Sequence, residues 1–341
     1  MKTQLIHIDR DCPQQHLVDA AGSLLAGGSL VAIPTETVYG LAANALDEQA
    51  VCAIFAAKGR PQDNPLIVHI ADIDDLTPLI EHLPPQAKML AEAFWPGPLT
   101  IILPRAKAVP DVVSAGLDTV AVRMPSHPVA RAIIRAAGVP LAAPSANRSG
   151  SPSPTTAEHV LQDMDGIIPL VVDGGACGVG VESTVLSLAN DTPVILRPGV
   201  ITKEQLEAVI GAVGIDGGVL AQVSDAVKAS SPGMKYKHYA PRAKVYIVEG
   251  EDNRFYNYVN SKTEAVALCF EEDNPHLTID YVNYGAQDDS DSQARHLFDA
   301  LRELDRKGAT IVYARAPKKT GVGLAVYNRL LRAAGFDVIE L

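Results

Sequence analysis

The stretch IPTETVYGLA, residues 33–42, decides how the first half of the chain is expected to fold. It follows SLVAI (29–33), a short apolar and β-branched run that is typical of a buried strand. Pro34 cannot donate a hydrogen bond to a sheet, so we expect the strand to end there. Three hydroxyl or carboxyl side chains, residues 35–37, come next. They would lie at the carboxyl edge of the strand, where open α/β sheets bind their ligands, although such a cluster could also simply cap a helix.

A turn and a helix are predicted after this strand. Gly40 allows a tight turn, and the apolar spacing of residues 47–58 predicts a helix with Asp47 as its N-cap. Lys58 closes this helix, and Arg60 follows beside two prolines and an asparagine. The two cations could compensate the dipole at the end of the helix, or they could bind an anion. The helix alone does not decide between these interpretations.

Two further segments place polar groups at the end of an apolar strand. DNPLIVHI, residues 63–70, has His69 near the end of the strand predicted for 66–70. This histidine could contact a substrate, or it could be a hydrogen-bonded residue of the core. LAAPSANRSG, residues 141–150, repeats the arrangement of small apolar strand, proline stop, and hydroxyl and amide groups, here Ser145 and Asn147.

In this order, the PTETVYGL segment, the Lys58-x-Arg60 pair and the Ser145-x-Asn147 pair resemble the YrdC-like threonylcarbamoyl-AMP synthase family. Each motif is short, and their combination makes the resemblance specific. It covers roughly residues 10–200, and the remaining chain resembles the C-terminal extension of the long, two-domain form.

The resemblance implies an enzyme, a nucleotidyltransferase that makes threonylcarbamoyl-AMP from L-threonine, bicarbonate and ATP and releases pyrophosphate. This is the first step of the t6A modification at adenosine 37 of tRNA. The product would pass to a tRNA threonylcarbamoyltransferase, and no stable tRNA binding is expected. Mg²⁺ would accompany ATP and neutralise part of the triphosphate charge.

The resemblance also implies substrate contacts, position by position. Lys58 and Arg60 would be the catalytic residues because they would hold the phosphates. The implied ATP contacts are Lys58, Arg60, Asn64, Thr119, Ser145, Asn147, Ser153, Arg197 and Tyr236. The implied threonine contacts are Thr35, His69, Arg123, the backbone of Ala143, and Ser183.

Arg123 also has a physical argument of its own. It lies inside the apolar strand predicted for residues 120–124, where an unpaired cation would be costly. We therefore expect it to face a carboxylate, which could belong to a substrate or to an internal Asp or Glu. Glu36 is a possible general base, but the sequence does not place it.

The composition is that of an ordinary globular protein with room for two domains. The chain has 341 residues, of which 47% are hydrophobic and 20% charged. Its net charge of −11 argues against a large surface for nucleic-acid phosphates, although a local basic pocket remains possible.

The cysteines and the N-terminus indicate a cytoplasmic protein without a membrane segment. Cys12, Cys52, Cys177 and Cys269 are scattered without metal-ligand spacing, which predicts free thiols and no zinc site. The first residues lack the apolar core of a secretory signal, and no apolar run reaches the eighteen or so residues of a membrane span.

The alternation of elements predicts an α/β protein with two domains. A twisted mixed-sheet domain of the YrdC type is expected in residues 1–216, a linker in 217–243, and a small Rossmann-like α/β domain in 244–341. In the last domain we predict strands at 244–248, 265–270, 310–314 and 337–341 and helices at 292–307 and 322–334.

The predicted linker contains SSPGMKYKHYAP, residues 230–241, which is rich in turn formers, tyrosines and basic residues. It could be a plain tether between domains. In the family that the chain resembles, this linker folds over the active site as a lid.

Other functions receive less support. The glycine-rich loop at 174–180 is not a Gly-x-Gly-x-x-Gly sequence that opens a helix, and no Walker motif is present, so a Rossmann or P-loop nucleotide site is not expected. Two alternatives remain, an RNA-binding module and a carbamoyl-adenylate transferase of the same fold. The net charge argues against the first, and the second would carry acylphosphatase and zinc-finger segments that are not visible here.

Overall fold

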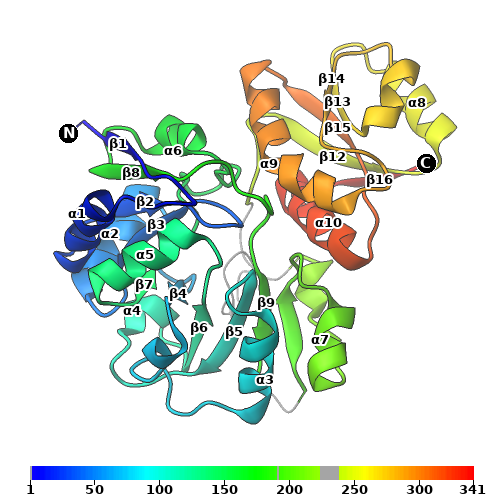
Figure 1. Ribbon diagram of the computed structural model, residues 1–341. Helices are drawn as coiled ribbons and strands as arrows, with labels where there is room; N and C mark the ends of the chain where they lie inside the picture. Colours follow the sequence, from blue (N-terminus) through cyan, green and yellow to red (C-terminus); the bar gives the residue numbers. More distant parts are fainter. Residues whose placement is uncertain (1, 190–191, 223–237) are drawn as a thin grey trace.

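The computed structural model describes residues 2–189, 192–222 and 238–341. Within these ranges the strands form two sheets, one of eleven strands that ends by residue 215 and one of five strands that begins at residue 244. The two sheets belong to two lobes, and helices α9 and α10 of the second lobe face the first (Figure 1). The predicted fold class, a mixed α/β sheet followed by a smaller α/β domain, is confirmed.

The first sheet has the order β1-β8-β2-β3-β7-β4-β6-β5-β9-β10-β11 and mixes parallel with antiparallel neighbours. Its strands are Gln4–His7 (β1), Val31–Ile33 (β2), Gly40–Asn44 (β3), Ile67–His69 (β4), Leu99–Pro104 (β5), Thr119–Arg123 (β6), Leu141–Ala142 (β7), Leu170–Asp173 (β8), Thr184–Ser187 (β9), Val194–Arg197 (β10) and Gly214–Ile215 (β11).

The segment after residue 39 differs from the prediction. Gly40–Asn44 forms β3, antiparallel to β2, where a turn leading directly into a helix was expected. Gly40 permits a close approach, because a Cβ there would lie 3.2 Å from the Cβ of Ala143. The strand was hard to predict because glycine and alanine have low β propensity. The helix itself is confirmed as α2 (Glu48–Lys58), and the Asp47 side chain accepts hydrogen bonds from its first turn.

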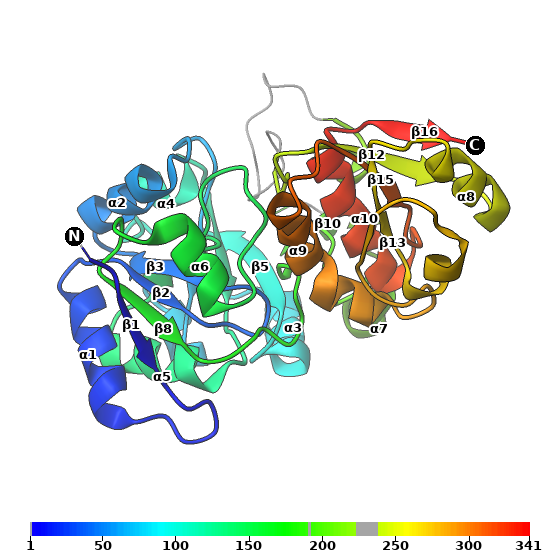
Figure 2. The same cartoon turned by 90° about the horizontal axis from the view of Figure 1, so that it is seen from above.

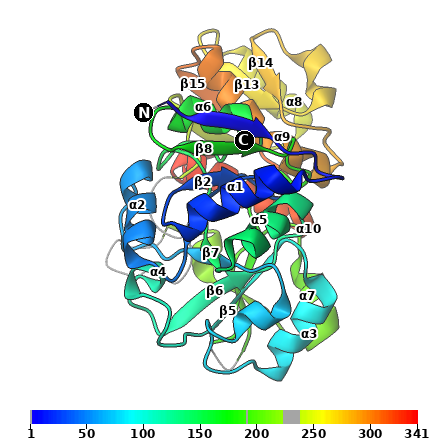
Figure 3. The same cartoon turned by 60° about the vertical axis from the view of Figure 1, so that its left-hand side comes forward.

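Helices cover both faces of the first sheet. α1 and α5 lie side by side over the β8-β2-β3 region (Figure 3). β1 and a loop precede α1, which begins at Gln15. The helices of this domain are Gln15–Ala26 (α1), Glu48–Lys58 (α2), Pro85–Phe94 (α3), Asp111–Ser114 (α4), Pro128–Ala137 (α5), Ala157–Met164 (α6) and Lys203–Ile210 (α7).

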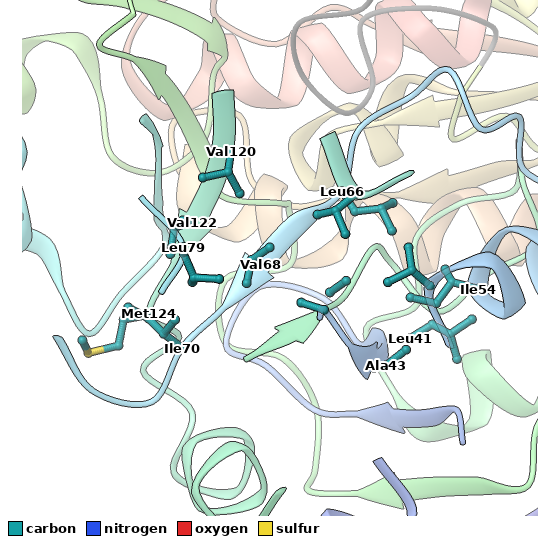
Figure 4. Close-up of a cluster of buried hydrophobic side chains, with 14 of the residues drawn as sticks. Leu41, Ala43, Ile54, Leu66, Val68, Ile70, Leu79, Val120, Val122 and Met124 are labelled. Atoms are coloured by element: carbon teal, nitrogen blue, oxygen red, sulfur yellow. The ribbon is translucent and has the colours of Figure 1, made fainter. Parts of the chain in front are cut away.

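A large apolar cluster fixes the centre of this sheet. Val68 from β4 and Val122 from β6 are fully buried in it, together with Leu41 from β3 and Ile54 from α2 (Figure 4). Because side chains alternate along a strand, the neighbours of Val68 and Val122 point to the opposite face. That opposite face carries the candidate site.

The second sheet is parallel throughout, with the order β14-β13-β15-β12-β16. Its strands are Lys244–Glu249 (β12), Val266–Cys269 (β13), Tyr281–Asn283 (β14), Ile311–Arg315 (β15) and Val338–Glu340 (β16), and its helices are Asp252–Asn260 (α8), Ser290–Arg306 (α9) and Gly321–Ala334 (α10). α9 and α10 pack together between this sheet and the first lobe (Figure 2). The strands and helices predicted for this domain are confirmed to within two residues at each end.

None of the helices in the described parts of the chain combines the length and the apolar character needed to cross a lipid bilayer.

Candidate active site

A pocket of about 730 Å³, including its open mouth, lies on the face of the first sheet opposite the apolar cluster. Ile67 and His69 of β4 and Arg123 of β6 line it, whereas Val68 and Val122 between them point into the core. The pocket therefore lies across a sheet face and not at one carboxyl edge, because the strands that form it run in both directions.

Most of the residues predicted to bind substrates come together here. The predicted residues that line the pocket are Thr35, Lys58, Arg60, His69, Arg123, Ala143, Ser145, Asn147, Ser183 and Arg197. They come from the β2–β3 connection, the end of α2, three strand ends and the segment after β7.

Three of the predicted residues do not line the pocket, and a fourth lies outside the described residues. Asn64 is buried behind Arg60, Ser153 is buried behind Glu182, and Thr119 lies at the start of β6. Tyr236 lies outside the described residues, as do the two lysines beside it.

The pocket concentrates positive charge in a chain whose net charge is −11. Lys58, Arg60, Arg123 and Arg197 line it, and Glu182 is the acidic residue among its lining side chains in the described part of the chain. Burial lowers the pKa of Arg197, and burial together with the neighbouring Arg197 lowers the pKa of Arg60 to about 10. Buried cations that repel one another are stabilised by an anion, so the electrostatics favour an anionic ligand.

Lys58 is held by backbone carbonyls. Its Nζ donates to the carbonyl oxygens of Ser145 and of Asn147, the second at 2.6 Å. Burial, and then the charge of Arg60, lower the pKa of this lysine well below its usual value. Lys58 therefore stabilises the segment that follows β7 through these hydrogen bonds. Because it also lines the pocket, its positive charge contributes to the electrostatic potential there.

Arg60 has donor capacity left. Its Nη2 donates to the carbonyl oxygens of Asn64, at 3.4 Å, and Pro65, at 3.3 Å. Among the described residues, its buried Nε has no hydrogen-bond partner, and neither do the side-chain amide atoms of Asn64. Unsatisfied buried polar groups are rare in folded proteins and are often completed by a ligand or by water.

Arg123 has the internal carboxylate that was one of its two expected partners. Its Nη2 lies 2.6 Å from Oε1 of Glu36, and both side chains are nearly buried. Its Nη1 also donates to Thr37 Oγ1 at 2.9 Å, and its Nε donates to Gly97 O at 3.3 Å. Glu36, the candidate base, therefore lies behind Arg123 and does not line the pocket.

His69 is a neutral group in this environment. Burial, followed by the charge of Arg123 beside it in the sheet, lowers the pKa of His69 to about 3. One ring nitrogen lies 3.3 Å from the carbonyl oxygen of Ile67. At neutral pH His69 can therefore take part in hydrogen bonds with a substrate but adds no charge.

Ser183 and Arg197 both line the pocket and are hydrogen-bonded to each other. Arg197 donates through Nε to Ser183 O and through Nη2 to Ser183 Oγ, both at 3.1 Å. The hydroxyl of Ser183 also lies 2.8 Å from that of Thr100 on β5. This serine is thus fixed in orientation before any ligand binds.

Sequence reasoning missed several pocket residues. Thr37, Glu182, His238 and Tyr239 line the pocket without having been assigned to a substrate. Tyr239 and His238 belong to the predicted lid segment, so their presence here could have been anticipated. Glu182 gave no signal, because its partners are remote in sequence and it lies in a loop.

No group of three or more His, Cys, Asp or Glu side chains among the described residues is arranged to hold a metal ion.

Two family models cover nearly all of the chain. The one described as "Telomere recombination", for Sua5, YciO and YrdC proteins, matches residues 23–199. The one described as "Threonylcarbamoyl-AMP synthase, C-terminal domain" matches residues 201–335.

Curated relatives and solved structures agree with these matches. Threonylcarbamoyl-AMP synthase of Pyrococcus abyssi is 47% identical, with 97% of this chain and 98% of the relative covered. The enzyme of the same name from Bacillus subtilis is 52% identical, with 94% and 93% covered. The crystal structure of P. abyssi Sua5 complexed with L-threonine superposes with a TM-score of 0.92 at 44% identity and covers 99% of this chain and 100% of that one.

Proposed function

The chain belongs to the threonylcarbamoyl-AMP synthase family, and from this premise we propose that it makes threonylcarbamoyl-AMP from L-threonine, bicarbonate and ATP. The amine of threonine would first capture bicarbonate or carbon dioxide as a carbamate. An oxygen of that carbamate would then attack the α-phosphorus of ATP and displace pyrophosphate. The observation that carries the proposal is a pocket with four cations and a neutral histidine in a chain of this family.

The reaction needs positioning and charge stabilisation more than a nucleophilic residue, because carbamate and triphosphate are both anionic. Arg60 and Arg197 are the groups best suited to phosphate oxygens, since a guanidinium can bind two oxygens at once. Lys58 would contribute charge, since its hydrogen bonds go to the carbonyls of the pocket wall.

Threonine would bind at the Arg123 end of the pocket. Its carboxylate would form an ion pair with Arg123, and its hydroxyl and amine would form hydrogen bonds with Thr35, His69 and Ser183. The structure of the P. abyssi relative is described as complexed with L-threonine, which supports L-threonine as a ligand of this chain by similarity.

Mg²⁺ would enter with ATP. Arg60 and Arg197 would hold the phosphates that carry the ion. When bound, the ion would neutralise part of the triphosphate charge.

The product would serve the t6A modification of tRNA and would pass to the enzyme that transfers the threonylcarbamoyl group. The free thiols of Cys12, Cys52, Cys177 and Cys269 support a reducing, cytoplasmic location.

Product analysis tests the proposal. The full chain is incubated with ATP, Mg²⁺, L-threonine and ¹³C-bicarbonate, and the products are separated and weighed by mass spectrometry. We expect ¹³C in a threonylcarbamoyl adenylate and an equal amount of pyrophosphate, with Arg60→Ala reducing both. ATP hydrolysis that is independent of threonine and bicarbonate, with no labelled adenylate, would overturn the assignment.

A binding-only role for RNA is less well supported. Three of the four cations of the site, Lys58, Arg123 and Arg197, are buried and Arg60 is half-buried, whereas RNA-binding proteins present a positive surface.

A further inference from the structure

Two arginines of the C-terminal domain reach the wall of the pocket in the first domain. Arg329 on α10 is fully buried, and Arg302 on α9 is 6% exposed. Neither lines the pocket itself. Both make hydrogen bonds to residues that flank or support Ser153, one of the residues assigned to ATP by resemblance.

Arg329 is hydrogen-bonded to both the side chain and the backbone of Glu182. Its Nε donates to Oε2 of Glu182 at 2.7 Å, its Nη2 donates to the backbone carbonyl of Glu182 at 3.3 Å, and its Nη1 donates to Pro198 O at 2.9 Å. The other carboxylate oxygen, Oε1, accepts from Ser153 Oγ at 2.5 Å. The chain of contacts runs from the C-terminal helix through the pocket-lining Glu182 to Ser153.

Arg302 acts on the residue before Ser153. Its Nη2 donates to the carbonyl oxygen of Pro152 at 2.6 Å and to Asp163 Oδ2 at 2.8 Å. The same guanidinium therefore joins α9 to α6 and to the loop that carries Ser153. Arg302 thus stabilises the backbone of this loop at Pro152, and Arg329 stabilises the Ser153 side chain through Glu182.

The backbones of the two domains also approach closely here. A Cβ on Gly180, which has φ +85°, would lie 2.4 Å from the carbonyl oxygen of Ala294 on α9. Only glycine fits at this place, two residues before Glu182. The segment that carries Glu182 therefore packs closely against the backbone of α9 in the second lobe.

We propose that Arg329 and Arg302 are positioning residues for the ATP site, which they complete from the C-terminal domain by fixing Glu182 and the loop of Ser153. This rests on the proposed function, because it assumes that ATP binds in the pocket that Glu182 lines. It gives the C-terminal domain an indirect part in substrate binding.

The network also determines that the Ser153 hydroxyl acts as a hydrogen-bond donor toward Glu182. Burial raises the pKa of Glu182, but Arg329 and Arg197 more than offset this, so its pKa lies below the usual value and the group is a carboxylate. A carboxylate only accepts hydrogen bonds, so Ser153 gives its proton to Glu182 and presents lone pairs to any other partner. Ser153 itself is fully buried and does not line the pocket, so the network reaches the pocket through the carboxylate of Glu182.

Matched arginine-to-lysine changes in the full chain test the proposal. Arg329→Lys and Arg302→Lys keep the charge but lose the forked geometry, and Arg306→Lys on α9 is the control, since Arg306 pairs with Glu303 and Asp299 of its own helix. For each variant the melting temperature, the Kd for ATP, the Kd for threonine and the KM and kcat are measured. We expect the Kd and KM for ATP to rise about tenfold in the first two variants, with kcat, threonine affinity and the control nearly unchanged.

A double-mutant cycle separates positioning from a general loss of structure. If Arg329 acts through Glu182 and Ser153, then Arg329→Lys should have little further effect on ATP affinity in a Ser153→Ala background. Additive effects in the cycle, or wild-type ATP affinity in folded Arg329→Lys and Arg302→Lys proteins, would overturn the proposal. Failure of the wild-type protein to bind ATP would instead overturn the proposed function.

Discussion

Two buried arginine–glutamate pairs flank the pocket, and they differ in how completely their hydrogen bonds are made. Arg123 and Glu36 lie within the first domain, 2.6 Å apart, whereas Arg329 and Glu182 join the two domains at 2.7 Å. In the interdomain pair, both carboxylate oxygens of Glu182 accept hydrogen bonds. In the other pair, neither oxygen of Glu36 nor Nη2 of Arg123 has a partner in hydrogen-bonding geometry within the part of the chain that the structure describes.

This difference separates structural support from ligand binding. A buried ion pair is stabilising only when its geometry is good and its remaining hydrogen bonds are made. The Arg329 pair meets this condition, so it can serve as a fixed support. The Arg123 pair does not, so Arg123 can exchange Glu36 for the carboxylate of a substrate at smaller cost.

The largest expected effect is on stability, for Arg329→Met. This change leaves the Glu182 carboxylate buried without its main partner, which typically lowers the free energy of unfolding by about 3–5 kcal/mol. Urea denaturation of the full chain, followed by circular dichroism, measures the loss.

A second change serves as the control for this prediction. Arg329→Met combined with Glu182→Leu should recover much of the stability, since no buried charge then remains unpaired. If Arg123→Met costs as much stability as Arg329→Met, the distinction between the two pairs is wrong.

The next effect is on threonine binding, for Arg123→Met. Charge-assisted hydrogen bonds are worth about 1.5–3 kcal/mol, so we expect the Kd for threonine to rise about ten- to a hundredfold. Titration calorimetry measures it. Arg135→Met is the control, because Arg135 is half exposed, pairs with Asp72 and lies outside the pocket. Equal losses in both variants would show that Arg123 does not bind the carboxylate.

A smaller effect, of opposite sign, is expected for Glu36→Gln. In the absence of threonine, Glu36 pairs with Arg123. Removing the charge of Glu36 should remove a competitor for Arg123 and also a negative charge that repels the carboxylate of threonine. We expect threonine to bind about threefold more tightly. Markedly weaker binding would instead indicate that Glu36 orients Arg123 or contacts the substrate.

The sequence was sufficient to predict the fold class, and ten of the residues that the family resemblance assigned to substrates line the pocket. The motifs that begin at residue 33 and at residue 141 are local in sequence, and periodicity reveals the strands and helices that position them. β3 was missed because its glycine and alanines lack the β-branched residues that mark a strand. The pocket's position on a sheet face was also missed, because it depends on strand direction, which the sequence does not display.

The interdomain arginines could not have been predicted for a similar reason. Arg329 lies on a helix where an arginine normally faces solvent, and its partner Glu182 is 147 positions away. Lys58 shows the same limitation. Its motif suggested a phosphate ligand, but the carbonyls that accept its hydrogen bonds lie 87 and 89 positions away.

The smallest effect concerns the rim of the domain contact, where exposure to solvent should weaken an ion pair. Asp299 on α9 lies 3.2 Å from Nε2 of His159 on α6, and more than half of the aspartate side chain is exposed. The hydrogen bond from His159, and then that from Arg306, lower the pKa of Asp299 from the ordinary 3.8 to about 2. A carboxyl whose pKa is lowered by folding adds stability above its unfolded pKa and loses that contribution as the pH falls through its folded pKa.

Asp299→Asn should therefore lower stability slightly at pH 6, by less than about 0.5 kcal/mol because the pair is screened by solvent. The difference from the wild type should vanish as the pH falls from about 4 toward about 2, and it should shrink in 1 M salt. Thermal melts of both proteins across this range measure it, and taking the difference cancels the protonation of other carboxylates. A difference that is as large at pH 2 as at pH 6 would show that it does not come from the charge of Asp299. A difference as large as that of Arg329→Met would show that the rim pair stabilises the protein as much as the buried pair.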